Sequence, residues 1–381
     1  MNRKKILFFL SLICLLGLDS FSQEMNFDWG KQFGSDAYTA DIQSITSDGQ
    51  NRFFAFTNFQ NTFSVEGVDY ESNGGDDLLL YALNEEGNVD WVVSEGGEDD
   101  EYAQLVKTDD EGNVYIAGKF TGSMVINGEE YISNGLFDMY MAKYSNDGEF
   151  IWVKILGGPN SESIISMEIK YNTIVLGGRF YDYTVIEEDT LFSYAGTDVF
   201  ISRFDLEGNL KNQIAFGGNS VDKIADMSID AYSNIYVIGD FYTDIYLDDD
   251  TYFETGDILG IYVAKYDAGL DLVWAHQLDG NDLNPDVRLE VSPSGLCYIS
   301  GPFMSDIHFG NSSISTQVSD VDLFLAAFHE DGSPDWISHY YSSSMESIVD
   351  MGIDQEGSIY LLGQYLSDIH FDELILNYSL C

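Results

Sequence analysis

The residues best suited to chemistry are acidic side chains crowded into one loop, DGNDLNPD, at residues 279–286. Asp279, Asp282 and Asp286 lie close together there, with asparagines between them. Oxygen ligands of this kind suit calcium, a hard cation, although the loop lacks the order and the terminal Glu of an EF-hand. We therefore take Asp279, Asp282 and Asp286 as the candidate metal site, with calcium as its ion. No residue is assigned a catalytic or cofactor-binding role.

A second group of aspartates recurs along the chain and opens a series of strand-like runs. Its members are Asp77, Asp138, Asp198 and Asp322, and Gly260 interrupts the series. Such carboxylates could bind calcium, or each could accept backbone N–H groups at the turn that opens a strand. Because the aspartate returns at one position of a repeat, the turn interpretation is favoured.

Two histidines occur in the same short sequence, SDIHF, 62 residues apart, as His308 and His370. A metal site is one interpretation of this repetition. Equivalent positions elsewhere in the chain carry other residue types, namely Ser64, Val125, Val185 and Tyr246. A position that accepts Val and Tyr favours packing over metal binding.

Strong catalytic signatures are absent: the sequence has no GxSxG, HExxH, CxxC, P-loop or dinucleotide-binding pattern. The chain has 65 acidic and 16 basic residues, a net charge of -49 over 381 residues. Nucleic acid is therefore a poor partner, because the protein repels phosphates. Its 45% of hydrophobic residues can nevertheless fill a large core.

The elements that must position these residues form a repeat of about 61 residues. Tryptophans mark it at 29, 91, 152, 274 and 336, and Asn212 stands where the remaining one would be. Glycines follow shortly after the first five of these six positions, as in Gly96-Gly97 and Gly157-Gly158. Repeats therefore start near 29, 91, 152, 212, 274 and 336.

Each repeat contains four short runs of apolar, β-branched and aromatic residues, separated by turn signals. Asp147-Gly148 and Asp331-Gly332 separate the Asp-led run from the Trp-bearing run, so these two strands should be antiparallel neighbours. Six repeats of four strands predict an all-β fold, a β-propeller of about six four-stranded blades.

Three segments carry a resemblance to a known family: DDEGNVYIAGKF at 109–120, SNIYVIGDF at 233–241 and FDMYMAKYSNDGEFIWVKILGG at 137–158. They resemble the SBBP-type β-propeller repeats of secreted bacterial proteins, common in Bacteroidetes, over residues 24–381. The resemblance implies this fold and export from the cell. It implies no common activity and no catalytic residues.

Residues 1–22 have the order of a secretory signal peptide. Basic residues 2–5 precede an apolar run at 6–18, and small residues at Ser20 and Ser22 place the cleavage near Ser22/Gln23. No later apolar run is long enough for a transmembrane helix. We expect a signal peptide at 1–22 and a repeat domain at 23–381, secreted or at the cell surface.

The last blade is expected to be incomplete. A closing Trp near residue 398 would be needed, but the sequence stops at Cys381, after FDELILNYSL (371–380), which reads as a third-strand run. One interpretation is a fragment of a longer secreted protein, and the other is a final blade with an open edge.

These observations favour a secreted, non-enzymatic scaffold that binds an extracellular protein or glycan. Two alternatives remain open. One is a calcium-dependent adhesion or glycan-binding module, for which the acidic loops are the support. The other is an extracellular hydrolase or lyase on the same scaffold, for which no motif brings two catalytic groups together.

Overall fold

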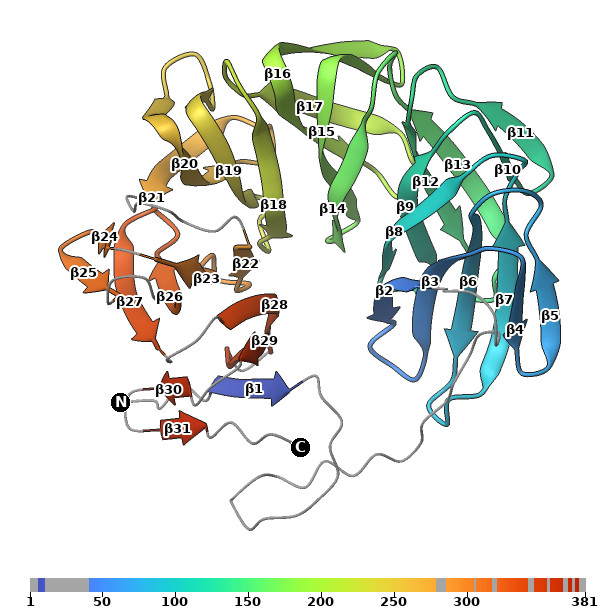
Figure 1. Ribbon diagram of the computed structural model, residues 1–381, viewed down its shortest axis with the longest axis horizontal. Helices are drawn as coiled ribbons and strands as arrows, with labels where there is room; N and C mark the ends of the chain where they lie inside the picture. The colour runs from blue at the N-terminus through green and yellow to red at the C-terminus, as the bar shows by residue number, and fades with distance from the viewer. Residues whose placement is uncertain are drawn as a thin grey trace. The chain divides into compact units, whose positions relative to one another are not determined.

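The computed structural model describes residues 6–10, 41–278, 286–304, 306–316, 321–341, 346–354, 357–365, 369–371 and 374–376. Every regular element within these ranges is a β-strand, and none is a helix (Figure 1). The all-β prediction is therefore confirmed for the part of the chain that is described. The same residues contain no helix long and apolar enough to cross a membrane.

The chain forms two compact units. The amino-terminal unit comprises Phe21–Ser193 and Val199–Ala215, and the carboxy-terminal unit comprises Met1–Ser20, Tyr194–Asp198 and Phe216–Cys381. Each unit is built from small sheets whose strands follow one another along the sequence, except in one three-stranded sheet of the carboxy-terminal unit.

Three four-stranded antiparallel sheets belong wholly or largely to the amino-terminal unit. The first contains β2 (Asp41–Ser47), β3 (Phe53–Phe59), β6 (Asp77–Leu83) and β7 (Val89–Glu95). The second contains β8 (Glu101–Thr108), β9 (Val114–Phe120), β12 (Asp138–Tyr144) and β13 (Phe150–Leu156). The third contains β14 (Ser163–Lys170), β15 (Thr173–Ile186), β16 (Asp189–Phe204) and β17 (Leu210–Phe216).

The carboxy-terminal unit repeats the arrangement. One sheet contains β18 (Asp222–Ile229), β19 (Ile235–Tyr246), β20 (Tyr252–Tyr266) and β21 (Leu272–Leu278). Another contains β22 (Arg288–Val291), β23 (Cys297–Phe303), β26 (Asp322–Phe328) and β27 (Pro334–Tyr340). A three-stranded sheet contains β28 (Glu346–Ile353), β29 (Ile359–Tyr365) and β1 (Ile6–Leu10), and β1 pairs with β29 in parallel.

Short two-stranded hairpins, which the sequence pattern did not reveal, lie between the second and third strands of several repeats. They are β4 (Thr62–Val65) with β5 (Val68–Glu71), β10 (Ser123–Ile126) with β11 (Glu129–Ile132), β24 (Asp306–Phe309) with β25 (Ser312–Ser315), and β30 (Ile369–Phe371) with β31 (Leu374–Leu376). The prediction of a third sheet strand at 371–380 is therefore wrong. Its described residues close β30 and form β31, and an apolar run this short does not distinguish a hairpin from a sheet strand.

The core of each four-stranded sheet lies on its two central strands. Every residue of β6, β12 and β26 is buried, although each strand begins with an aspartate. Large aromatic side chains such as Tyr81, Tyr140 and Phe324 fill this layer. Burial on both faces shows that apolar side chains cover each sheet on its two sides. The expected antiparallel pairing of the third and fourth strands is confirmed in four of the four-stranded sheets, for β6 with β7, β12 with β13, β20 with β21 and β26 with β27.

The tryptophans recur because they make equivalent contacts with the next repeat. Trp91 donates its indole N–H to the carbonyl of Asn146, at 3.0 Å, in the turn of the next repeat. A Cβ on Gly148, the glycine of that turn, would lie 2.9 Å from the Trp91 ring. Trp152 donates likewise to the carbonyl of Leu206. The tryptophans therefore have a structural role, and the turn glycine leaves room for the ring of the preceding repeat.

Candidate functional site

The calcium loop lies mostly outside the described residues, which include Asp286 but neither Asp279 nor Asp282. Asp286 is exposed. The described part of the chain contains no group of three or more His, Cys, Asp or Glu side chains arranged to hold a metal ion. The loop therefore remains a prediction from the sequence.

The recurring aspartates make the backbone contacts expected of turn residues. Asp77 and Asp138 open β6 and β12 as predicted, whereas Asp198 lies within β16 and does not open a strand. Asp77 Oδ2 accepts the N–H of Asn73 at 2.9 Å, and Asp138 Oδ2 accepts that of Asn134 at the same distance. Asp198 Oδ2 accepts a shorter bond, 2.6 Å, from the N–H of Tyr194. The turn interpretation thus accounts for one oxygen of each carboxyl group.

A second acidic residue stands beside each of these aspartates, and the sequence pattern did not reveal it. Glu101 and Asp222 open the first strand of the next repeat, and Glu162 comes directly before that strand. Their side chains are at most 1% exposed. The N–H of Gly97 binds Glu101 Oε1 at 3.1 Å. We call Asp77 with Glu101, Asp138 with Glu162, and Asp198 with Asp222 the carboxyl pairs.

Three glycine pairs, Gly96-Gly97, Gly157-Gly158 and Gly217-Gly218, lie against both members of a carboxyl pair. A Cβ on Gly96 would lie only 2.2 Å from Asp77 Cγ, so no larger residue fits without a shift. A Cβ on Gly97 would lie 3.2 Å from Glu101 Oε1. The glycines therefore let two carboxyl groups approach the same stretch of backbone.

Several oxygens of the carboxyl pairs are buried without a hydrogen-bond partner. These atoms are Asp77 Oδ1, Glu101 Oε2, both carboxyl oxygens of Glu162, Asp198 Oδ1 and Asp222 Oδ1. An unsatisfied buried carboxylate is costly, because it has lost its hydration without gaining a partner. Each pair must therefore hold something that offsets this cost, and the two options are a proton and a cation.

Burial gives the first pair a strong preference for the protonated form. Burial, and to a smaller extent the nearby negative charge of Asp77, together raise the pKa of Glu101 to about 8, against the opposing effect of the bond from Gly97. Burial likewise raises the pKa of Asp77 to about 6, although the backbone N–H of Asn73 opposes the shift. In the absence of a cation, the first pair therefore holds at least one proton near neutral pH.

The other pairs behave alike. Burial raises the pKa of Glu162 to about 7, and it raises the pKa of Asp138 as well. Burial raises the pKa of Asp222 to about 8, with Asp198 as the largest charge contribution, and that of Asp198 to about 6. The same electrostatic arrangement therefore recurs in both units.

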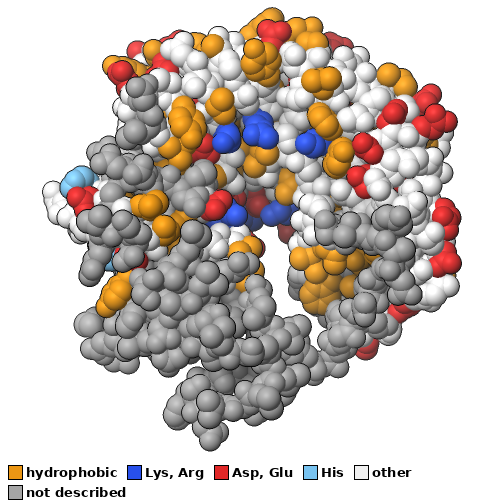
Figure 2. Space-filling model, in the orientation of Figure 1, with side chains coloured by type: hydrophobic (Ala, Val, Ile, Leu, Met, Phe, Trp, Pro, Cys, Tyr) orange, Lys and Arg blue, Asp and Glu red, His pale blue; other side chains and the backbone are white. Residues whose placement is uncertain are grey.

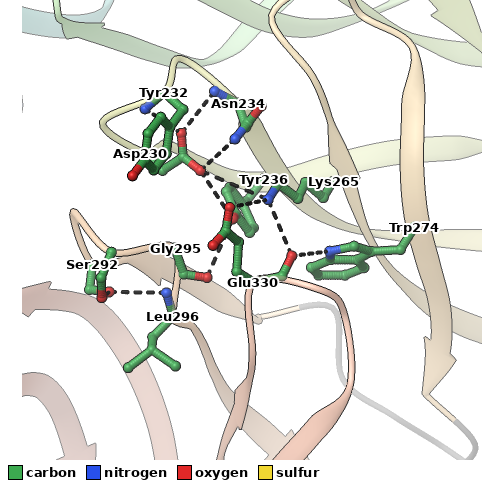
Figure 3. A network of polar contacts seen from close by, with 11 residues as sticks. Asp230, Tyr232, Asn234, Tyr236, Lys265, Trp274, Ser292, Gly295, Leu296 and Glu330 are labelled. Carbon is green, nitrogen blue, oxygen red and sulfur yellow. Dashed lines mark hydrogen bonds and ion pairs between the residues drawn. The ribbon is translucent and has the colours of Figure 1, made fainter.

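A different acidic network holds the opposite ends of the same strands. Asp230 accepts the backbone N–H groups of Tyr232 and Asn234 and the hydroxyl of Tyr236, which are drawn in Figure 3. The ammonium group of Lys265 lies 4.0 Å from Asp230 Oδ2 and donates to the carbonyl of Glu330 at 3.2 Å. Both ionised side chains are at most 5% exposed.

This Lys–Asp network also includes a tryptophan and has a counterpart in the amino-terminal unit. Trp274 donates to the same carbonyl that Lys265 binds (Figure 3). In the counterpart, Lys143 lies 3.6 Å from Asp109 Oδ2, and Tyr115 donates to the same oxygen. Charge and hydrogen-bonding capacity are balanced in these networks, which indicates a structural role.

The histidines do not form a site among the described residues. His308 is exposed on β24, so its expected packing role is wrong; alternate residues of this short hairpin strand face solvent. Only the backbone of His370 is described. His339, which the sequence analysis did not single out, lies 2.6 Å from Asp322 Oδ2. An imidazole thus contacts the strand-opening aspartate in that repeat.

A shallow pocket of about 330 Å³ lies next to the second carboxyl pair. Its lining includes Tyr131, Ile155 and Glu187, together with Asn134 and Gly157. Asn134 donates its backbone N–H to Asp138, so the pocket wall and the buried pair share a segment of backbone. The pocket can accept part of a ligand, whereas the carboxyl groups of Asp138 and Glu162 are buried below the surface.

The carboxyl pairs lack the access that glycoside hydrolysis needs. Hydrolases of that kind place two carboxyl groups on either side of a bound sugar, so both groups must reach the substrate. Glu101, Glu162 and Asp222 are at most 1% exposed. The pairs can hold a proton or a cation, but they do not contact a substrate from this position.

Comparisons with known proteins give likeness to solved structures alone. No protein-family model matches the sequence, and no curated protein matches it. A protein of unknown function from Bacteroides caccae is similar over 85% of this chain and 86% of its own, with 10% identity and a TM-score of 0.37. Drosophila Semaphorin 2a is similar over 84% and 72%, with 9% identity and a TM-score of 0.34. The extracellular domain of a hybrid two-component system from B. thetaiotaomicron is similar over 92% and 61%, with 11% identity and a TM-score of 0.21.

Proposed function

We propose that the protein is a secreted, non-enzymatic β-propeller of SBBP-type repeats that serves as a binding scaffold outside the cell. Residues 1–22 are removed as a signal peptide, so the mature chain lacks β1 and its pairing with β29, and residues 23–381 form blades of about 61 residues. The observation that supports this proposal best is the recurrence of the same interior contacts from repeat to repeat. The tryptophan bond to the next repeat and the carboxyl pair at the strand ends each recur in this way.

The recurrence of these polar clusters favours a scaffold over an enzyme. An active site needs different groups that converge at one place, whereas the strongest polar clusters here are copies of one another. Their side chains are buried, so they hold the sheets together and leave the surface loops to contact a partner. The expected partner is an extracellular protein or a glycan.

A direct experiment uses the chain expressed with its own amino terminus in a secreting bacterium. We expect an exported protein whose sequence starts near Gln23 and which releases no product from panels of polysaccharides and peptides. An amino terminus at Met1 on the exported protein would contradict the signal peptide. Turnover of any substrate that is lost in a Glu162→Gln variant would contradict the non-enzymatic scaffold.

Calcium-dependent adhesion is the second candidate, because unpartnered buried oxygens are what a hard cation binds. Thermal unfolding in calcium, in magnesium and in EDTA tests it. A calcium-specific rise in the melting temperature that disappears in a Glu101→Gln variant would favour a cation in the carboxyl pairs. Equal melting temperatures in all three buffers would favour a shared proton instead.

A further inference from the structure

Lys119 and Arg179 form a basic pair in a strongly acidic chain. Lys119 lies on β9 and Arg179 on β15, in sheets that follow one another in the amino-terminal unit, and both side chains are half-buried. Among the residues that the structure describes, neither cation has a carboxylate within ion-pair distance. Many other basic residues do, among them Lys107, Lys154 and Lys211. With 65 acidic residues in the chain, two neighbouring cations without a counter-charge call for an explanation.

The surroundings of Lys119 are aromatic. Its ammonium group lies 4.5 Å from the centre of the Phe137 ring and 5.5 Å from that of Tyr102. The two rings contact each other edge to face, with their centres 5.9 Å apart. Burial and the positive charge of Arg179 both lower the pKa of Lys119. The ring faces favour a cation, yet they leave its charge without a full counter-charge.

The strands hold the two cations in fixed positions. Lys119 stands opposite Tyr102 in the β8–β9 register, and Arg179 stands opposite Ser163 in the β14–β15 register. Gln104, two residues after Tyr102, donates its side-chain N–H to Ser163 Oγ at 3.0 Å and so joins the two sheets. Gln104 Oε1 is buried without a partner and can accept a further hydrogen bond.

Figure 2 shows Lys and Arg side chains gathered on the drawn face. A single anion bound by Lys119 and Arg179 would relieve their mutual repulsion. A planar guanidinium group binds a carboxylate through two parallel hydrogen bonds, and an ammonium group adds a compact charge. The net charge of -49 opposes the approach of a polyanion, so the ligand should carry few negative charges.

We propose that Lys119 and Arg179 bind the carboxylate group of an otherwise uncharged ligand. This inference goes beyond the scaffold function, because it names the site and the chemistry that the site recognises. It depends neither on export nor on the number of blades. Two sources supply such a group, a terminal sugar acid and the carboxyl terminus of a peptide.

Ligand-observed NMR and calorimetry on the whole protein test the proposal with four probes. Methyl glucuronide and acetyl-Gly-Gly carry the carboxylate, and methyl glucoside and acetyl-Gly-Gly amide are their neutral counterparts. We expect at least one carboxylate probe to bind and neither neutral probe to do so. Binding of the sugar acid alone identifies a glycan source, and binding of the peptide alone identifies a protein carboxyl terminus.

Variants connect the binding to the two cations. Lys119→Gln and Arg179→Gln should each weaken binding about tenfold, the effect of losing one charge-assisted hydrogen bond. Lys119→Arg keeps the charge and should retain binding, which provides a test if the Gln variant folds poorly. Lys211→Gln, at an exposed ion pair with Asp205, is the matched control and should bind as the wild type does. The proposal is overturned if neither carboxylate probe binds, or if the Gln variants bind as well as the wild type.

Discussion

The two ends of the repeat sheets carry the same kind of residue in opposite electrostatic states. At one end, Asp230 is fully buried, accepts hydrogen bonds on both oxygens and lies near Lys265. At the other end, Asp77 is equally buried but faces Glu101, and each of these two acids has an unpartnered oxygen. Burial alone therefore does not decide the role of an aspartate. The sign of the charge beside it does.

The difference has a consequence for stability. In a buried ion pair the two opposite charges compensate each other, so the pair needs no further proton or cation. A pair of buried acids is compensated only while a proton or a cation lies between them. The Lys265–Asp230 end therefore stabilises the fold without a further ligand. The contribution of the carboxyl pair depends on pH and on whether a cation is bound.

The largest expected effect comes from removing the cation at the compensated end. Lys265→Met leaves Asp230 buried without its counter-ion, which should lower the free energy of unfolding by about 3 kcal/mol or more. Urea denaturation at neutral pH measures the change. The matched control is Lys211→Met, whose ion pair with Asp205 is exposed and should cost less than about 1 kcal/mol. Equal losses in the two variants would mean that the buried network contributes nothing special.

A smaller effect with a pH signature is expected at the other end. Because the pKa of Glu101 is raised from 4.5 to about 8 in the folded state, the folded protein holds its proton more tightly than the unfolded chain. The stability from this group is fully present below about pH 4.5 and is lost as pH rises through about 8.

Glu101→Gln isolates this contribution, because the amide imitates the protonated acid. In EDTA, the variant should be as stable as the wild type near pH 4.5 and more stable near pH 8.5, by an amount of the order of 1 kcal/mol. The exposed Glu86, changed to Gln, is the control and should not alter the pH profile. A constant difference between Glu101→Gln and the wild type across this range would contradict the shared proton.

The smallest effect concerns the side-chain amides that support each aspartate. Asn234 binds Asp230 Oδ2 at 2.7 Å, whereas Asn73 binds Asp77 Oδ2 at 3.3 Å. Asn234→Ala should therefore cost about 1 kcal/mol, and Asn73→Ala should cost less. Urea denaturation of the two variants beside the wild type would test the order, and the reverse order would show that bond length is a poor guide here.

Much of the repeat could be predicted from the sequence, because strand patterns and turn residues are local properties. Alternation of apolar residues and the Asp-Gly turns predicted the antiparallel third and fourth strands, and the tryptophans predicted the period. The short hairpins were missed because strands of three or four residues leave too brief a pattern. The structural role of the tryptophans could not be predicted either, because Trp91 donates to the carbonyl of Asn146, which lies in the following repeat.

The sequence pattern revealed only one member of each carboxyl pair, the recurring aspartate. Asp77 was recognised because an aspartate returns at its position in later repeats. The position of Glu101 carries Glu in some repeats and Asp in another, and Glu101 itself opens a strand of mixed polarity, so no pattern marked it. A register signal was nevertheless present: Gly96, Gly157 and Gly217 each follow a recurring aspartate by 19 residues. In the fourth repeat the two residue types are exchanged, with Gly260 first and Asp279 at the later position. That exchange keeps one carboxyl group in the repeat.

The sequence by itself determined the all-β character, the repeat length and the turns of this protein, because each depends on residues near one another in the chain. Tertiary structure alone decided which charges meet. Glu101 reaches Asp77 and Lys265 reaches Asp230 only after separate strands have paired and packed. Charge pairing acts over a few ångströms in space, a distance that spacing along the chain does not report.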